Sequence, residues 1–328
     1  MSTINKEQNR MTRRDFVKKA AAGTAAVIGA GMLATPAQVQ AQSPQPWLPA
    51  KWDYEADVVV VGFGLAGINA ALVADDARAN VILLEKAPEK FAGGNSTVSG
   101  GASVLHTAAG ISDAKLYYRA LGSIPDELAD AMAEELVDDK FKAWYDKLGI
   151  GYYVGNGNVA TFKTLPGSSA INVTLTVTDK PDGFSNGRKN WLAFKGVLAK
   201  RSGIKVMYET PAKHLIQDPI TKGILGVVAE QMGKQIYIKA KRGVVLACGG
   251  FEFNYEMQDY FNYPGIKIYS RGSPYNTGDG LNMASEIGAP LWHMTGVEFH
   301  KLALKTASDS FGLAVSSNMP TNNYVLVN

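Results

Sequence analysis

One short pattern restricts the fold of this chain more than any other: an apolar strand, a glycine-rich turn and a helix in immediate succession. Residues 56–61 are mostly valine, as expected for a strand buried on both faces of a parallel sheet. Gly62-Phe63-Gly64-Leu65-Ala66-Gly67 follows, and residues 68–77 are alanine-rich and predicted to be helical. A second apolar strand, 81–84, ends at Glu85, 18 residues after Gly67. This order predicts a dinucleotide-binding unit.

Each glycine of the turn has a physical reason in such a unit. Gly62 permits the tight turn, Gly64 lets the backbone approach a pyrophosphate, and Gly67 allows the helix to pack closely on the strand. The helix N-terminus offers N–H groups and partial positive charge to phosphates. A carboxylate at the end of the second strand can accept hydrogen bonds from ribose hydroxyls. We also expect contacts from residues beside these positions, so the predicted set is Gly62, Gly64, Ala66, Gly67, Glu85 and Lys86.

A second glycine-rich segment, residues 93–101, contains four glycines and four small polar residues. By composition alone, a flexible surface loop is the alternative. Its place just after Glu85 favours a second cradle of backbone N–H groups and hydroxyls around a long ligand, and FAD is such a ligand. The residues expected to contact it are Gly93, Gly94, Asn95, Ser96, Ser99, Gly100 and Gly101.

Three later segments extend the pattern. Residues 125–149 are predicted to be helical and end in Trp-Tyr-Asp-Lys-Leu-Gly; residues 243–251 read as a strand ending in Ala-Cys-Gly-Gly-Phe; residues 276–280 are Asn-Thr-Gly-Asp-Gly. The last would be an ordinary loop in most proteins. Together and in this order, the motifs resemble the flavoprotein subunit family of fumarate reductases and succinate dehydrogenases, with its urocanate reductase-like and ketosteroid dehydrogenase-like relatives.

The resemblance implies an α/β protein: a Rossmann-like FAD-binding domain of the GR2-type, glutathione reductase-like flavoprotein fold, with only the start of an α+β capping domain. It places Ala212 beside the adenine and Asp279 on the ribityl or pyrophosphate part of FAD. The further FAD contacts it implies are Gly249, Gly250, Thr277 and Gly278. Members that tether flavin do so through a histidine ahead of the second glycine pair. The stretch Gly94-Asn95-Ser96 has none, so we expect FAD to be bound non-covalently.

The implied activity is that of an FAD-dependent oxidoreductase of the fumarate reductase type. Hydride would pass between flavin N5 and an activated C=C or CH–CH bond of a small unsaturated acid or enone. A ketosteroid dehydrogenase-like flavoenzyme is the alternative. His300 falls near the family's His-Pro-Thr motif and is a candidate for substrate binding, although a surface histidine fits equally, and His293 is a further candidate. His106 and His214 lie in segments expected to line or flank FAD.

The first 41 residues are expected to be a signal peptide. Thr12-Arg13-Arg14-Asp15-Phe16-Val17-Lys18 resembles a twin-arginine export signal, an apolar run covers 20–34, and a small-residue cleavage pattern ends at Ala41. An amphipathic helix with two chance arginines is the alternative. We therefore expect periplasmic export, a linker over 42–52, the first segment of the FAD-binding domain over 53–298, and the start of the capping domain over 299–328.

Composition excludes several other classes. Beyond residue 41 the chain holds 27 basic and 28 acidic residues, so it lacks the excess of positive charge that nucleic-acid binding requires. No apolar stretch is long enough for a transmembrane anchor, and no metal site is predicted. Cys248 is the single cysteine, so neither a disulfide nor an iron–sulfur cluster is expected, and we interpret its thiol as buried and inert. Electrons would then come from a separate donor, a cytochrome or a reduced flavin or quinone system, to a small-molecule substrate.

Two further expectations concern the core and the end of the chain. Spacings of three and four residues predict buried positions in the 125–149 helix, namely Leu128, Met132, Leu136, Phe141, Trp144 and Leu148. Residues 323–328 read as a strand after which the family continues with the rest of its cap, an arginine proton donor and a C-terminal segment. We therefore expect a truncated chain with an unpaired sheet edge, or one completed by a second chain. An inactive FAD-binding fragment is the corresponding alternative.

Overall fold

A computed structural model describes residues 48–292 except 123, 179–184, 263–264 and 266–271, together with 294–295 and the backbone of 303–304 and 313–314. Residues 46–328 group as one compact unit, and the description below concerns that unit. The expected signal peptide, His293, His300 and the strand at 323–328 lie outside the described residues.

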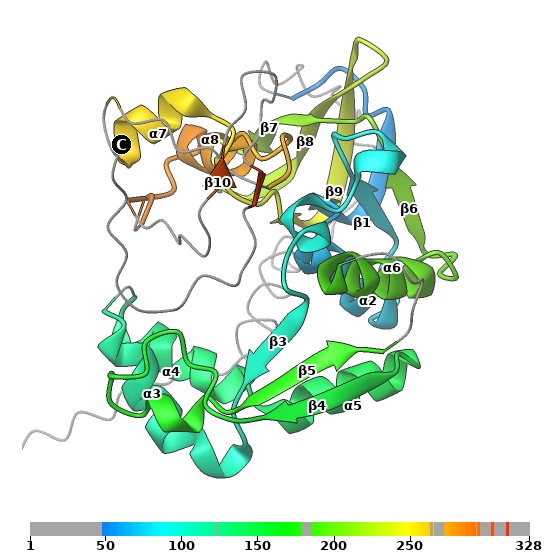
Figure 1. The fold of residues 1–328 in the computed structure, drawn as a ribbon. Coiled ribbons are helices and arrows are strands. Elements are labelled where there is room, and N and C mark those ends of the chain that lie inside the picture. The colour runs from blue at the N-terminus through cyan, green and yellow to red at the C-terminus, as the bar shows by residue number, and fades with distance from the viewer. Residues whose placement is uncertain are drawn as a thin grey trace, which may run out of the picture. The chain divides into compact units, whose positions relative to one another are not determined.

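A six-stranded mixed sheet forms the centre of the unit, in the order β6-β2-β1-β9-β8-β7 (Figure 1). β6, β2, β1 and β9 are parallel to one another, whereas β8 and β7 continue the sheet as antiparallel strands. This is the parallel arrangement that the βαβ pattern predicts. The strands are β1 Tyr54–Val61, β2 Val81–Leu84, β6 Ile204–Met207, β7 Ala212–Gln217, β8 Ile224–Gln231 and β9 Lys234–Leu246.

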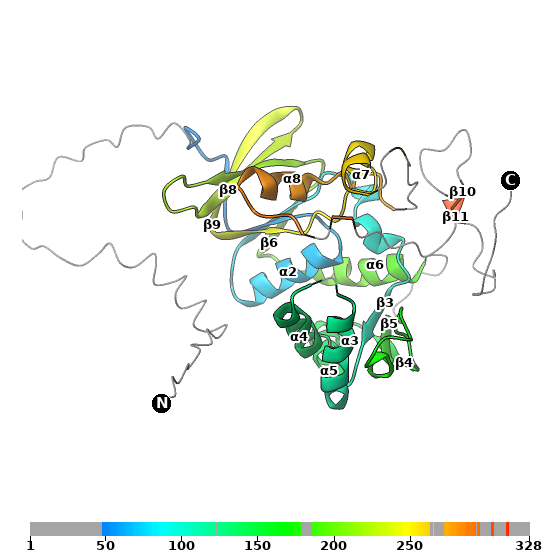
Figure 2. The same ribbon diagram turned by 90° about the vertical axis from the view of Figure 1, so that its left-hand side faces the viewer.

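Helices cover both faces of this sheet. α2 (Leu65–Asp76) and α6 (Asn186–Leu198) pack on one face around Val60 and Leu83, while α8 (Asp279–Glu286) packs on the other through Met283. Figure 2 shows α2 and α6 on one side of the strands and α8 on the opposite side. Because successive residues of a strand point to opposite faces, β1 is buried on both and requires its continuous valine run.

β9 is one long strand that begins at Lys234, well before residue 243, where the predicted strand 243–251 starts. Its first half pairs with β8 as far as Lys239, and the strand then continues to Leu246 along β1. Beyond Lys239 the edge of β9 that faces away from β1 pairs with no strand among the described residues, and Val245 there is 37% exposed. Among the described residues, this edge of the parallel part of the sheet is therefore unpaired over residues 240–246.

A second, antiparallel sheet has the order β3-β5-β4 and lies with three helices in the lower part of Figure 1. The elements are β3 Ala102–Leu105, β4 Tyr152–Asn156, β5 Val173–Val177, α3 Ile111–Ala120, α4 Asp126–Glu135 and α5 Asp138–Leu148. The predicted 125–149 helix is therefore two helices, interrupted at residues 136–137. The short elements are η1 Glu89–Phe91, η2 Gly94–Thr97, η3 Ala108–Gly110, η4 Ser168–Ala170, α7 Tyr255–Phe261, β10 Ala303–Leu304 and β11 Leu313–Ala314.

The core prediction for this region is wrong at two positions. Leu128 is 56% exposed and Met132 is 40% exposed. α4 packs through the small residues Ala129 and Ala133, which are fully buried, so its larger side chains face outward. The other four residues are partly buried and pack against the main core: Leu136, Phe141, Trp144 and Leu148. None of the helices that the structure describes is both long and apolar enough to cross a membrane.

Candidate functional site

The predicted phosphate loop forms a tight turn between β1 and α2. Gly62 has a φ of +107°, and a Cβ there would collide with the carbonyl oxygen of Ala247, the residue that directly follows β9. A Cβ at Gly67 would collide with the Gly62 carbonyl. The backbone N–H of Leu65 donates to Ser96 Oγ over 3.0 Å, which links the two glycine-rich segments. The first turn of α2 carries no acidic residue, so its N-terminus keeps its positive potential.

A cavity of about 300 Å³ lies at the carboxyl ends of β1, β2 and β9, bounded there by Val61, Leu84 and Leu246. This is the place where α/β sheets bind their ligands. Most of the predicted cofactor residues line it: Gly62, Gly64, Ala66, Glu85, Lys86, Gly94, Asn95, Ser96, Ala212, Gly249, Gly250 and Asp279. Seven do not: Gly67, Gly93, Ser99, Gly100, Gly101, Thr277 and Gly278.

Two of those seven, Gly93 and Gly101, pack behind the wall of the cavity. Gly93, with a φ of +109°, leaves room for Trp191, whose indole Nε1 donates to the carbonyl of Phe63 in the phosphate loop over 2.7 Å. Gly101, with a φ of +71°, packs against the backbone of Asn186 at the start of α6. Their glycine identity thus follows from close packing, against side chains at Gly93 and against backbone at Gly101.

Glu85 is buried at the end of β2, where both of its carboxylate oxygens accept backbone hydrogen bonds. Oε2 accepts from the N–H of Phe63 over 3.2 Å, and Oε1 accepts from the N–H of Ala87 over 2.8 Å. Burial raises the pKa of this carboxyl, while the two N–H groups act in the opposite direction. A carboxylate has further lone pairs, so it can still accept from a ligand hydroxyl.

Lys86 joins the end of β2 to the start of α8. Its Nζ lies 2.6 Å from Asp279 Oδ2 and 2.7 Å from Thr277 Oγ1, and the Thr277 hydroxyl donates to Asp279 Oδ1 over 2.7 Å. In the sequence, Lys86 is 191 residues from Thr277 and 193 residues from Asp279, and these hydrogen bonds bring the three side chains together beside the cavity. The resemblance placed Thr277 and Asp279 at the cofactor, Lys86 was predicted there from its place after Glu85, and the structure adds the pairing between them.

Sequence reasoning missed several lining residues, which include Phe63, Thr210, Cys248, Ser273, Tyr275 and Asn276. Asn276 directly precedes the Thr-Gly-Asp-Gly motif and is buried, so its position in the motif was the available clue. Cys248 contributes part of the wall, and burial raises the pKa of its thiol to about 11, as an inert thiol requires.

Neither of the two described histidine side chains lines the cavity, although Ala212, two residues before His214, does. His106 is fully buried, with Nδ1 2.9 Å from the Thr107 carbonyl and Nε2 2.8 Å from the Ala133 carbonyl, and so ties β3 to α4. His214 is exposed on β7, with Nδ1 2.8 Å from Glu286 Oε2. Across the described ranges no group of acidic, histidine or cysteine side chains could hold a metal ion.

These features fit a dinucleotide. The turn leaves no space for a side chain at Gly62, a helix N-terminus points at the cavity, and a buried carboxylate stands at the end of the second strand. A family model described as "FAD binding domain" matches residues 57–319. The chain belongs to the FAD-dependent fumarate reductase and succinate dehydrogenase flavoprotein family. Its cofactor is FAD, as predicted.

Individual relatives agree with the family. A probable fumarate reductase of Shewanella frigidimarina is 30% identical over 256 residues, which cover 74% of this chain and 40% of the relative. Digoxin reductase of Eggerthella lenta is 29% identical over 325 residues, covering 86% and 55%. The structure of 3-ketosteroid-Δ4-(5α)-dehydrogenase from Rhodococcus jostii RHA1 matches with a TM-score of 0.63 and 26% identity, covering 75% and 56%. The chain spans about half the length of the curated relatives it matches.

Proposed function

We propose that the protein is an FAD-dependent reductase that reduces an activated carbon–carbon double bond of a small unsaturated acid or enone. The observation that carries this proposal is the cavity at the carboxyl ends of β1, β2 and β9, within a chain of the fumarate reductase flavoprotein family. The relatives named fumarate reductase, digoxin reductase and urocanate reductase support reduction as the direction.

The residues that would hold FAD follow from the geometry. The backbone of Gly62 and Gly64 and the N-terminus of α2 would bind the pyrophosphate, and Glu85 would accept from ribose hydroxyls. The pair formed by Lys86 and Asp279 offers both a donor and an acceptor to the remaining polar chain of the cofactor. FAD supplies the two-electron redox chemistry when it is bound.

Non-covalent binding of FAD is part of the proposal. The η2 segment beside the cavity reads Gly-Asn-Ser-Thr and offers no histidine for a tether. Electrons would come from a separate donor, a cytochrome or a reduced flavin or quinone. Residues 1–41 would direct export to the periplasm, with cleavage near Ala41 and a linker as far as residue 52. His300 remains a candidate for substrate binding.

A ketosteroid dehydrogenase-like activity is the second candidate. It is favoured by the TM-score of 0.63 to the Rhodococcus ketosteroid dehydrogenase. The two candidates differ in direction: a dehydrogenase would oxidise a CH–CH bond of a saturated 3-ketosteroid with an oxidising dye as acceptor, whereas the proposed reductase would reduce a C=C bond with a reduced donor.

The first experiment is an absorbance spectrum of the purified chain after incubation with FAD and removal of free cofactor. We expect stoichiometric bound flavin that acid precipitation releases, since no covalent link is proposed. Reduced viologen then serves as electron donor for assays on fumarate, urocanate and a 4-ene-3-ketosteroid. A chain that retains no flavin, or flavin that stays with the precipitate, contradicts the cofactor site or its non-covalent character respectively.

Two matched variants locate the bound flavin. Asp279→Asn removes the charge paired with Lys86 and should weaken FAD binding about tenfold, the order expected when a charged hydrogen bond is lost. Glu286→Gln on the same helix changes a carboxylate that contacts His214 away from the cavity, and should leave FAD binding unchanged. Equal effects of the two variants would argue against this location.

A further inference from the structure

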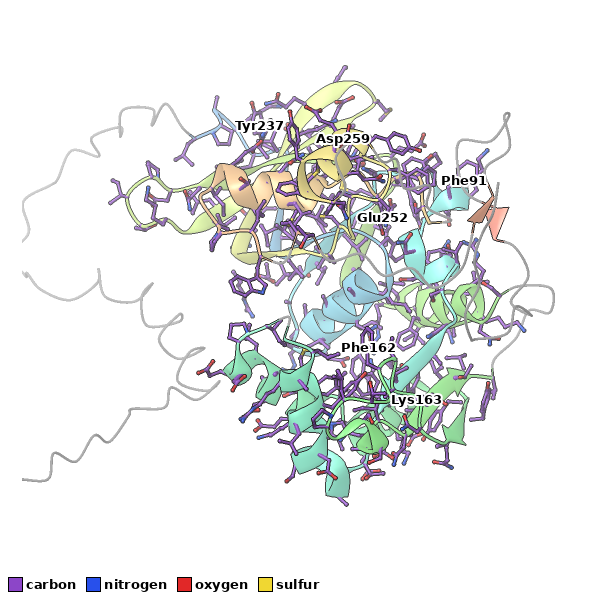
Figure 3. All side chains as sticks on the ribbon, turned by 60° about the vertical axis from the view of Figure 1, so that its left-hand side comes forward. Phe91, Phe162, Lys163, Tyr237, Glu252 and Asp259 are labelled. Atoms are coloured by element: carbon purple, nitrogen blue, oxygen red, sulfur yellow. The ribbon has the colours of Figure 1, made fainter. Side chains whose placement is uncertain are left out.

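Three segments of the cavity wall meet at the carboxylate of Glu252. Asn95 Nδ2 donates to Glu252 Oε1 over 2.5 Å, and Asn276 Nδ2 donates to the same oxygen over 3.4 Å. Asn95 belongs to η2, Asn276 to the loop before α8, and Glu252 follows the glycine turn after β9. Both asparagines line the cavity, whereas Glu252 stands behind them. In Figure 3, Glu252 lies on the inner side of α7, toward the middle of the molecule.

The contacts of Asn95 define one orientation of its amide. Oδ1 accepts from the backbone N–H of Ser273 over 2.8 Å, while Nδ2 donates to Glu252. A carboxylate can only accept and a backbone N–H can only donate. Turning the amide over would therefore create two repulsive contacts at once. The carboxylate of Glu252 thus sets which end of Asn95 faces each neighbour.

The glycine turn is packed directly against this pair of side chains. A Cβ at Gly250 would lie 2.8 Å from Glu252 Oε2, and a Cβ at Gly249 would lie 3.0 Å from Asn276 Oδ1. The segments are also joined by a backbone hydrogen bond of 3.0 Å from Phe253 N to the Asn276 carbonyl. The backbone connection does not depend on the carboxylate, so replacing Glu252 removes the side-chain contacts and leaves the loops joined.

The second carboxylate oxygen of Glu252 is buried in a way that does not stabilise the fold. Oε2 is buried and has no hydrogen-bond partner within the part of the chain that the structure describes. Leaving a buried acceptor without a donor is unfavourable, the more so for a charged group. Groups of this kind that persist in folded proteins call for a functional explanation.

We infer that Glu252 is a positioning residue of the FAD site: its carboxylate holds the amides of Asn95 and Asn276 in one orientation at the cavity wall before FAD binds. Preorganised polar groups increase affinity because they need not be ordered on binding. The inference rests on the proposed FAD site. It assigns to Glu252 no contact with the cofactor itself.

The test compares Glu252→Ala and Glu252→Gln in the full chain, with Glu256→Ala as a control on the exposed first turn of α7. FAD affinity is measured by fluorescence titration, the environment of bound flavin by its visible absorption and circular dichroism, and apoprotein stability by thermal unfolding. The alanine variant should bind FAD about tenfold more weakly and alter the spectrum, because both amides lose their acceptor. The glutamine variant keeps an acceptor oxygen and should bind within about threefold of the wild type. The control should match the wild type.

Two results overturn the inference: wild-type affinity and spectrum in the alanine variant, or a loss of apoprotein stability with an unchanged spectrum, which would make Glu252 merely structural. If the alanine variant does not fold, Asn95→Asp replaces it. That change opposes two carboxylates and should reproduce the weaker binding and altered spectrum, and wild-type values would overturn the inference equally. Failure of the wild type to bind FAD refutes the proposed function as well, whereas failure of this inference alone leaves wild-type binding intact.

Discussion

Replacement of Trp191 by phenylalanine tests how the phosphate loop is supported. Trp191 is fully buried, its Nε1 donates to the Phe63 carbonyl over 2.7 Å, and its ring packs edge-to-face on Phe63 with centroids 5.6 Å apart. Phenylalanine leaves that carbonyl without its donor, which costs about 1–3 kcal/mol. The smaller ring also leaves a void of roughly two methylene groups, at about 0.8 kcal/mol each. We expect the free energy of unfolding to fall by about 2.5–4.5 kcal/mol.

Trp144→Phe is the matched control. This indole also donates one hydrogen bond, from Nε1 to Asn69 Oδ1 over 2.7 Å, but its side chain is only partly buried and lies away from the FAD cavity. Its loss should cost about 0.5–1.5 kcal/mol. Urea unfolding of the two apoproteins gives both values, and FAD titration should show weaker binding only for Trp191→Phe, because Phe63 lines the cavity. Equal losses of stability, or wild-type FAD affinity in Trp191→Phe, would refute the reasoning.

Three other predictions follow from single groups. Burial raises the pKa of Glu85 above its usual 4.5, so its ionisation opposes folding. Relative to Glu85→Gln, the wild-type apoprotein should therefore lose stability as pH rises from 4.5 through the folded-state pKa; urea unfolding at several pH values measures the difference, and the opposite slope would contradict it. The rise in the pKa of Cys248 from 9.0 to about 11 should slow its alkylation by iodoacetamide at pH 8 about a hundredfold, with the rate recovering in urea. Gly101→Ala should lower the melting temperature more than Gly122→Ala. Both glycines have positive φ, but only at Gly101 does a Cβ collide with backbone, that of Asn186; equal shifts would show that the backbone yields.

The sequence predicted best those elements whose formation depends on residues close to one another in the chain. β2 covers the predicted residues 81–84, and β1 begins two residues before its predicted start at 56. Within about thirty residues, three features together determine this part of the fold: a run of valines, a turn that only glycine can make, and the helix that follows. The same local pattern predicted a dinucleotide-binding unit, whereas the family and FAD required the later motifs at 93–101, 125–149, 243–251 and 276–280 as well.

Predictions failed where the outcome depended on contacts between elements rather than on the residues within one element. Leu128 and Met132 fit the periodicity of a buried helix face, yet α4 has an equally periodic face of alanines. Close approach of α3 selects the small residues, and nothing within α4 indicates which face meets another helix. The strand predicted at 243–251 begins nine residues earlier as β9, and the basic residues 241–242 lie within it because its exposed edge there accepts charged side chains.

The cavity is likewise formed partly by residues adjacent in the chain and partly by pairs that are distant in it. Its phosphate loop is made by residues adjacent in the chain, whereas its walls are joined by pairs such as Lys86 with Asp279 and Asn95 with Glu252, which are 193 and 157 residues apart. A change at Gly62 blocks the turn on which β1, α2 and β9 all pack, so it removes the site together with the fold. A change in one of the distant pairs leaves the sheet formed and alters only what the cavity holds. Variation among relatives that share this fold is therefore expected to accumulate in the distant pairs, where ligand binding can change while the protein still folds.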